Sequence, residues 1–285
     1  LAAAVGVYGI SALLVLVNGT LAGLLTLAME RRGEAGRWRG ALLPLGIACL
    51  ALVGTFAYAR VLWRDPTGGA PIHVGLLQAN IDQSLKWERG YQTATLDIYE
   101  RLARRVAAER PALIVWPETT LPFFLRRETE LAPRVQRLLA ETGTPMLIGS
   151  PDVGNDGRLY NTAFLLGADG RIHGRYDKRH LVPFGEYVPL QTIFFFLDKL
   201  VVGIGDFGRG RTATVFSLDG ARFSVMICYE VIFPGEVREF VRAGAQFLVN
   251  ITNDAWFGRS GAPSQHLAMA AMRAVENGTY LVRAA

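Results

Sequence analysis

Cysteine and histidine are both scarce in this sequence, and their placement excludes two kinds of structure. Only 2 cysteines occur among 285 residues, and Cys49 lies within an apolar run, which makes it a poor disulfide partner for Cys228. The 4 histidines are scattered, without a pair at the spacing of metal ligands. We therefore predict neither an intramolecular disulfide nor a metal centre.

Positive charge is present but is too weakly organised to indicate a nucleic-acid partner. The formal net charge is +5, yet the chain has no lysine-rich tail and no stripe of basic residues alternating with aromatic residues. A cluster such as Arg101, Arg104, Arg105 and Arg110 fits the solvated face of a helix. Because net charge alone is weak evidence for binding, we expect no nucleic acid among the partners.

Apolar residues are abundant, and they concentrate near the start of the chain. They make up 51% of the sequence, and the runs 1–29 and 41–62 are each long enough to cross a hydrocarbon core, which needs about 20 residues. Four arginines lie in the link between the two runs, and the positive-inside rule places such a loop in the cytoplasm. We predict a membrane region over residues 1–64 with two transmembrane helices, and a soluble remainder on the opposite side.

The pattern changes after a cluster of turn-forming residues at 65–71, which we take as the domain boundary. Short apolar strands then alternate with amphipathic helices, which is typical of an α/β domain. Strands are expected at 72–78, 112–116, 146–149, 160–167, 171–176, 222–227, 247–251 and 280–282, and helices at 91–109, 128–142, 234–244 and 263–277. The sequence thus predicts an α/β domain over residues 70–285.

Three of the expected strands are directly followed by a chemically reactive side chain, namely Glu118, Lys178 and Cys228. Ligands bind beyond the carboxyl ends of strands in α/β sheets, so these three ends can converge on one pocket. A glutamate can take the proton of a thiol, whose usual pKa is about 8.5. A lysine can favour the thiolate and stabilise an oxyanion. The set suits acyl transfer through a thioester, without a metal or an organic cofactor.

Each of the three residues also has an ordinary structural explanation when it is taken alone. A lone cysteine after a strand is most often a small buried residue. Glu118 is compatible with a carboxylate at a helix N-terminus, and Lys178 lies beside other charged residues of a loop. The interpretation as a catalytic set therefore depends on the combination and on the flanking residues.

The order Glu–Lys–Cys, each after a short strand, resembles the nitrilase (carbon–nitrogen hydrolase) superfamily. The local sequences are similar to its apolipoprotein N-acyltransferase branch. They are QANIDQSLKW at 78–87, WPETT at 116–120, YDKRHLVPFGEYVP at 176–189, ICYE at 227–230, NITNDAWFG at 250–258 and QHLAMAAMRAVE at 265–276. Soluble nitrilases share the three catalytic residues but lack the membrane helices and the long sequence after the lysine.

The resemblance implies a fold and a set of residue roles. The fold is α/β, a four-layer αββα nitrilase-like sandwich preceded by transmembrane helices that are part of a larger bundle. By the same likeness, Glu118 is the general base, Lys178 stabilises the oxyanion and Cys228 carries the acyl group. Four further positions match family residues that matter for activity. These are Glu186, which supports the lysine, together with Tyr229, Glu230 and Trp87.

The resemblance also implies a reaction and a location. A phospholipid, typically phosphatidylethanolamine, acylates the cysteine, and the amine of a diacylated apolipoprotein then takes the acyl chain. The site lies at the bacterial cytoplasmic (inner) membrane, with the catalytic domain on the periplasmic side of a multi-pass protein. Because the family has further spans both before and after this region, we expect this chain to be a fragment that lacks both ends, with an incomplete C-terminus.

The sequence also contains an unusual apolar segment, and it leaves two other functions open. The segment 190–204 is unusually apolar, and it fits either a buried core helix or an arm that dips into the outer leaflet and guides acyl chains. A membrane-tethered amidase acting on a small amide would use the same three residues with water as the second nucleophile. A non-catalytic membrane scaffold is the third interpretation, although all three residues are intact.

Overall fold

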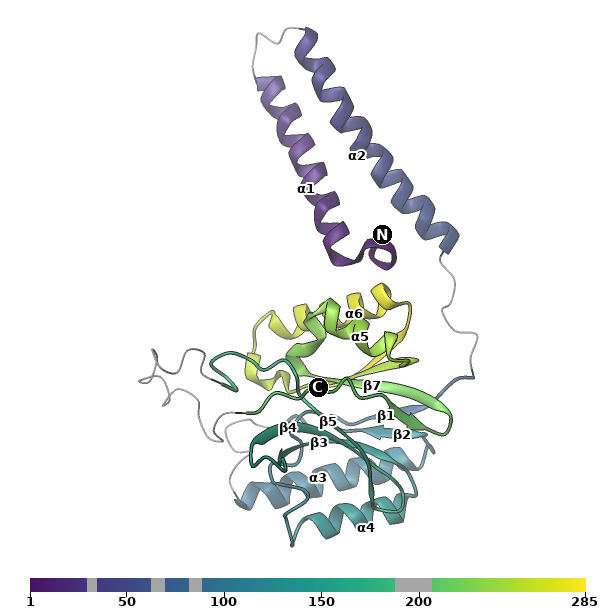
Figure 1. Ribbon diagram of the computed structural model, residues 1–285, viewed down its shortest axis with the longest axis vertical. Coiled ribbons are helices and arrows are strands. Elements are labelled where there is room, and N and C mark those ends of the chain that lie inside the picture. Colours follow the sequence, from purple (N-terminus) through teal and green to yellow (C-terminus); the bar gives the residue numbers. More distant parts are fainter. Residues whose placement is uncertain (30–34, 63–69, 82–88, 188–206) are drawn as a thin grey trace. The chain divides into compact units, whose positions relative to one another are not determined.

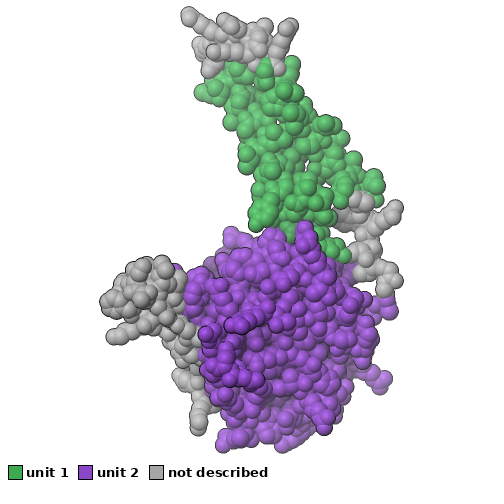
Figure 2. Space-filling model, in the orientation of Figure 1, with its two compact units in different colours: residues 1–69, 274–278 green, residues 70–273, 279–285 purple. Residues whose placement is uncertain are grey.

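The computed structural model describes residues 1–29, 35–62, 70–81, 89–187 and 207–285 (Figure 1). The chain divides into two compact units (Figure 2). One comprises residues 1–69 and 274–278, and the other comprises residues 70–273 and 279–285. Trp87 and the apolar segment 190–204 lie outside the described residues, so the expectations for them stay predictions.

The first unit contains two helices, α1 (Ala2–Met29) and α2 (Ala35–Leu62). Both are long and apolar enough to cross a membrane, as the sequence predicts, and only 6% and 11% of their most apolar stretches are buried. Large apolar side chains such as Leu14, Leu43 and Leu50 are exposed on them. An exposed apolar surface of this size is more stable in contact with lipid or another apolar partner than in contact with water.

The second unit contains a five-stranded sheet in the order β1-β2-β3-β4-β5. The strands are β1 (Val74–Leu76), β2 (Leu113–Val115), β3 (Met146–Val153), β4 (Leu159–Leu166) and β5 (Ile172–Asp177). The first three run parallel, and the last two are antiparallel additions. Helices α3 (Arg89–Ala107) and α4 (Ala132–Thr142) lie along one side of this sheet (Figure 1).

A four-stranded sheet follows in the order β6-β7-β8-β9. Its strands are β6 (Phe216–Leu218), β7 (Ala221–Ile227), β8 (Phe247–Ile251) and β9 (Tyr280–Ala284), of which the last three are parallel. Helices α5 (Pro234–Arg242) and α6 (Ala262–Asn277) lie on its outer side (Figure 1), and α6 belongs to this unit as far as Arg273.

Alternation of side chains along the strands builds two separate cores. Leu113 and Val115 of β2 belong to a cluster shared with β7, β8 and α5, so they face the second sheet. Ile114 and Trp116 belong to the cluster under α3 and α4. Because successive side chains of a strand point to opposite faces, one short strand serves both layers. The four-layer αββα arrangement predicted for the domain is therefore confirmed.

The elements agree with the sequence prediction apart from a few boundaries. The helix expected from residue 128 begins at Ala132, and Pro133 lies in its first turn, where a fixed φ and a missing N–H are tolerated. Strand β6 was not predicted. It pairs with β7 through a tight turn in which Asp219 and Gly220 have positive φ angles of 47° and 84°, the backbone form typical of a two-residue hairpin.

Candidate active site

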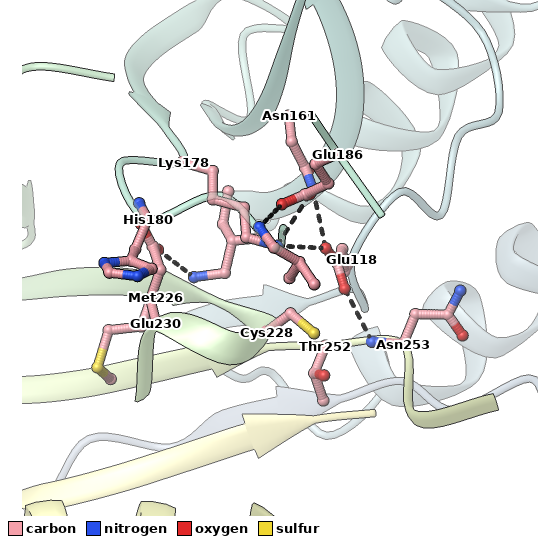
Figure 3. A network of polar contacts seen from close by, with 12 residues as sticks. Glu118, Asn161, Lys178, His180, Glu186, Met226, Cys228, Glu230, Thr252 and Asn253 are labelled. Carbon is pink, nitrogen blue, oxygen red and sulfur yellow. Dashed lines mark hydrogen bonds and ion pairs between the residues drawn. The ribbon is translucent and has the colours of Figure 1, made fainter. Parts of the chain in front are cut away.

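The three residues singled out in the sequence lie together in the structure (Figure 3). Glu118 follows β2, Lys178 follows β5 and Cys228 follows β7. The Lys178 Nζ atom is 3.5 Å from Oε1 of Glu118, and both side chains are almost completely buried. The first sheet thus supplies the carboxylate and the ammonium, and the second sheet supplies the thiol.

Lys178 is a buried ammonium held between two carboxylates. Its Nζ donates to Oε1 of Glu186 at 2.9 Å in addition to its contact with Glu118. Burial alone lowers the pKa of Lys178, but the negative charges of Glu118 and Glu186 outweigh burial, and the net pKa is raised. The side chain therefore stays charged and acts as a donor and an electrostatic partner, not as a base.

Glu118 is held through both of its carboxylate oxygens. Oε1 accepts a hydrogen bond of 2.8 Å from Nδ2 of Asn161, and Oε2 accepts one of 3.1 Å from the backbone N–H of Asn253. The backbone N–H of Glu118 also donates to the carbonyl of Thr252, at 3.4 Å. These contacts orient the carboxylate from β4 and from the segment that follows β8.

Asn161, on β4, is a site residue that the sequence analysis did not identify. Its Nδ2 donates both to Glu118 and, at 3.0 Å, to Oε1 of Glu186. Its carbonyl accepts the backbone N–H of Lys178 at 2.8 Å. The only signal in the sequence is the polar pair Asn161 and Thr162 inside a largely apolar strand, LYNTAFLL. The structure shows that Asn161 contacts both carboxylates and the backbone of the lysine.

The thiol of Cys228 is protonated in the resting site. Burial is the largest effect and the charge of Glu118 adds to it, so that the pKa of Cys228 is raised to about 12. The charge of Lys178 and a hydrogen bond with Thr252 act in the opposite direction. A thiolate therefore forms only when a neighbouring group takes the proton, and the carboxylate of Glu118 lies beside the thiol (Figure 3).

Glu230 connects the lysine loop to the cysteine turn. Its Oε1 accepts the backbone N–H groups of Arg179 and His180 at 2.6 and 3.1 Å, together with the hydroxyl of Tyr176 at 2.8 Å. Its Oε2 accepts the N–H of Ile227 at 2.7 Å. Burial raises the pKa of Glu230, although these hydrogen bonds oppose the rise. Glu230, which the resemblance also singles out, thus binds the backbone next to Lys178 and the backbone next to Cys228.

Glu186 and Tyr229, which the resemblance also singles out, both have described surroundings. Glu186 contacts Lys178 as described, and its Oε2 accepts the N–H of Val182 at 2.9 Å. Tyr229 is partly exposed, and its ring makes an edge contact with Phe233 at a centroid distance of 5.2 Å. Its side chain therefore lies beside the nucleophile turn and remains accessible to a ligand.

A cavity of about 380 Å³ opens on the Glu118 side of this cluster. Glu118, Thr252 and Asn253 contribute to its wall, and α3 adds Thr95 and Tyr99. Among the described residues, no three His, Cys, Asp or Glu side chains lie close enough together to hold a metal ion. A carboxylate, an ammonium and a thiol side by side are the groups that nucleophilic acyl transfer uses.

Two mixed sheets packed face to face, with a carboxylate, an ammonium and a thiol at three strand ends, define a nitrilase-type enzyme. Residues 73–285 match the sequence profile of the carbon-nitrogen hydrolases. The chain belongs to the carbon-nitrogen hydrolase family.

Curated relatives carry a more specific name. A protein of Geobacter metallireducens called apolipoprotein N-acyltransferase is 46% identical over 98% of this chain and 54% of its own length. Proteins of the same name from Methylococcus capsulatus and Nitrosomonas europaea are 42% and 39% identical over 98% of this chain, and over 53% and 54% of their own lengths. The chain therefore spans about half the length of the curated relatives it matches.

Solved structures agree on the fold. An amidase from Nesterenkonia sp. is 23% identical with a TM-score of 0.54, covering 76% of this chain and 77% of its own. Saccharomyces cerevisiae Nit3, a member of branch 10 of the nitrilase superfamily, is 20% identical with a TM-score of 0.55, covering 75% and 74%. These likenesses establish the nitrilase fold of the second unit.

Proposed function

We propose that this chain carries the catalytic site of an apolipoprotein N-acyltransferase, an enzyme that moves an acyl chain from a phospholipid to the N-terminal amine of a diacylated lipoprotein. One observation carries the proposal. The likeness to proteins of that name extends over 98% of the chain, which includes both apolar helices as well as the nitrilase-type unit.

In the first half-reaction, Glu118 takes the proton of Cys228 as the sulfur attacks the ester carbonyl of the phospholipid. The C–S bond forms, and the carbonyl oxygen becomes an oxyanion that the Lys178 ammonium stabilises. Collapse breaks the ester C–O bond, and Glu118 returns the proton to the departing lysophospholipid oxygen. The products are a thioester on Cys228 and a free lysophospholipid.

In the second half-reaction, the α-amine of a diacylglyceryl-cysteine attacks the thioester carbonyl. Glu118 takes a proton from the attacking nitrogen, and Lys178 again stabilises the oxyanion. Collapse breaks the C–S bond, and the sulfur leaves with the proton that Glu118 holds. An amide forms on the lipoprotein, and the three residues return to their starting protonation states.

The donor and the location are part of the same proposal. Phosphatidylethanolamine is the proposed donor. The two helices would anchor the protein in the bacterial cytoplasmic membrane, with the link rich in arginine on the cytoplasmic side and the catalytic unit on the periplasmic side. The exposed apolar surface of α1 and α2 supports the anchoring step.

Intact mass spectrometry of the protein in detergent tests the proposal. After mixing with phosphatidylethanolamine, we expect an added mass of one fatty acyl group that a diacylglyceryl-cysteine peptide discharges. Cys228→Ala should abolish the adduct, whereas Cys49→Ala, which removes the other cysteine, should leave it unchanged. Hydrolysis of a small amide without any acyl adduct would replace the transferase by an amidase, and failure in both assays would favour the scaffold.

A further inference from the structure

The backbone carbonyl of Cys228 is held by two side chains that the acyl-transfer steps do not use. Cys228 has a φ of 54°, which lies in the left-handed region that a non-glycine residue adopts at a cost of about 1–3 kcal/mol unless its surroundings enforce it. Its carbonyl oxygen accepts hydrogen bonds from Nε2 of His266 at 3.1 Å and from Nδ2 of Asn250 at 3.4 Å. Both donors therefore act at the strained turn itself.

One guanidinium orients both of these donors. Nη1 of Arg283, on β9, donates to Oδ1 of Asn250 at 2.6 Å, and Nη2 donates to Oδ2 of Asp254. The other Asp254 oxygen lies 3.0 Å from Nδ1 of His266. Nη2 of Arg283 also lies 3.0 Å from Nδ1 of His266. Arg283 thus reaches the Cys228 carbonyl by two routes, one through Asn250 and one through His266, which it contacts both directly and by way of Asp254.

The chemistry of arginine fixes the direction of the first route. A guanidinium only donates hydrogen bonds, so the oxygen of the Asn250 amide must face Arg283. The amide nitrogen then faces the carbonyls of Met226 and Cys228, as observed. A lysine, with a single point charge, cannot span two acceptors in the same fork geometry.

Burial and charge favour a rigid array. The side chains of Arg283 and His266 are 8% and 6% exposed. Burial raises the pKa of Asp254, but its hydrogen bond with His266 and the charge of Arg283 outweigh burial, and the net pKa is lowered. Asp254 therefore stays a carboxylate between a guanidinium and an imidazole. The three side chains come from β9, the segment after β8 and α6.

We propose that Arg283, Asp254 and His266, together with Asn250, form a positioning array that holds Cys228 in the left-handed turn from which its sulfur reaches Glu118 and Lys178. The array does not touch the acyl group. It acts by fixing the backbone of the nucleophile. The inference rests on the proposed function only in taking Cys228 as the nucleophile.

Two single substitutions of His266, each by a residue with an amide side chain, separate the effect of the hydrogen bond from the effect of packing. The amide nitrogen of His266→Gln reaches the position of Nε2 and keeps the donor to Cys228, whereas His266→Asn reaches only the position of Nδ1 and loses it. We expect single-turnover acylation of Cys228 by phosphatidylethanolamine to slow about 10- to 100-fold in His266→Asn. In His266→Gln it should stay within about threefold of wild type. The KM for the phospholipid should not change in either variant.

Two further measurements separate this inference from the proposed function. Alkylation of Cys228 by iodoacetamide requires no phospholipid and should follow the same order, with His266→Asn slower than His266→Gln. Ser264→Ala, an exposed change on the same helix, should match wild type in both assays. If wild type is not acylated but alkylation keeps this order, the transferase proposal fails and the positioning array stands.

Arg283 provides the second variant pair. Arg283→Gln loses the fork and should slow alkylation at least as much as His266→Asn, and Arg283→Lys should recover only part of the rate. Thermal unfolding identifies variants that are unfolded at the assay temperature. Equal alkylation and acylation rates in folded His266→Asn, His266→Gln and wild type would overturn the positioning array, as would a wild-type rate in Arg283→Gln.

Discussion

The ammonium of Lys178 is paired with two carboxylates at different distances, and neutralising one of them tests the electrostatics of the site. Nζ lies 2.9 Å from Oε1 of Glu186 and 3.5 Å from Oε1 of Glu118. With an effective dielectric constant of about 20, these contacts attract by about 6 and about 5 kcal/mol before desolvation is subtracted. Glu186→Gln therefore removes roughly half of the attraction that offsets burial of the lysine.

We expect Glu186→Gln to cost less than the about 3–5 kcal/mol that follows when a buried charge loses its partner entirely, because Glu118 remains. A loss of about 2 kcal/mol corresponds to a melting temperature lower by about 4–8 °C for a unit of this size. Acylation of Cys228 should slow about 10- to 100-fold, because the lysine is drawn toward the base and both lose their alignment.

A double-mutant cycle with Lys178→Met decides whether this reasoning is correct. Without the ammonium, Glu118 and Glu186 are two buried like charges, so Glu186→Gln should then raise the melting temperature instead of lowering it. Thermal unfolding of the intact protein in detergent measures both backgrounds, with the exposed Glu109→Gln as the control. The same decrease with and without Lys178 would refute the proposed coupling.

Three further outcomes follow from the geometry of the site. The pKa of about 12 of the Cys228 thiol predicts that iodoacetamide alkylation accelerates about tenfold per pH unit from about pH 7 to 10, and a plateau near pH 9 would contradict it. Gly149→Ala places a Cβ 2.6 Å from the backbone beside Glu118 and should slow acylation about 100-fold. Gly235→Ala meets nothing within 4 Å and should match wild type. Asn161→Asp adds a third carboxylate beside Glu118 and Glu186. Repulsion between these charges raises the pKa of the introduced carboxyl group in the folded state, so the variant should lose more melting temperature at about pH 8 than at about pH 5. An equal loss at both pH values would count against the repulsion.

Local sequence was sufficient to predict the layers and to single out three residues that lie together in the structure. The spacing of apolar residues in strands and in helices is a pattern among near neighbours in the chain. Most strands and helices of the second unit could therefore be located within a few positions. Glu118, Lys178 and Cys228 each follow a short apolar strand, and the carboxyl ends of strands meet at one place in such folds. The two apolar helices could also be predicted from local sequence, because the length and composition of an apolar run are enough to indicate such a helix.

Contacts between distant segments were not predictable from the same patterns. Asn161 is one of two adjacent polar residues in a largely apolar strand, and its contacts appear only when β4 is paired with β3 and β5. His266, on a helix later in the chain, contacts the carbonyl of Cys228, and Arg283, on the last strand, contacts the Asn250 side chain that holds the same carbonyl. Strand β6 was missed because three residues are too few to show a period.

The chemical character of this protein was therefore determined by the sequence, and its tuning was decided by the tertiary structure. A carboxylate, an ammonium and a thiol, in that order along the chain, specify what the site can do. Burial decides that the thiol of Cys228 rests protonated, and the flanking carboxylates decide that Lys178 stays charged. These properties depend on distances and on exclusion of water, which residues far apart in the chain acquire only when the two sheets pack together.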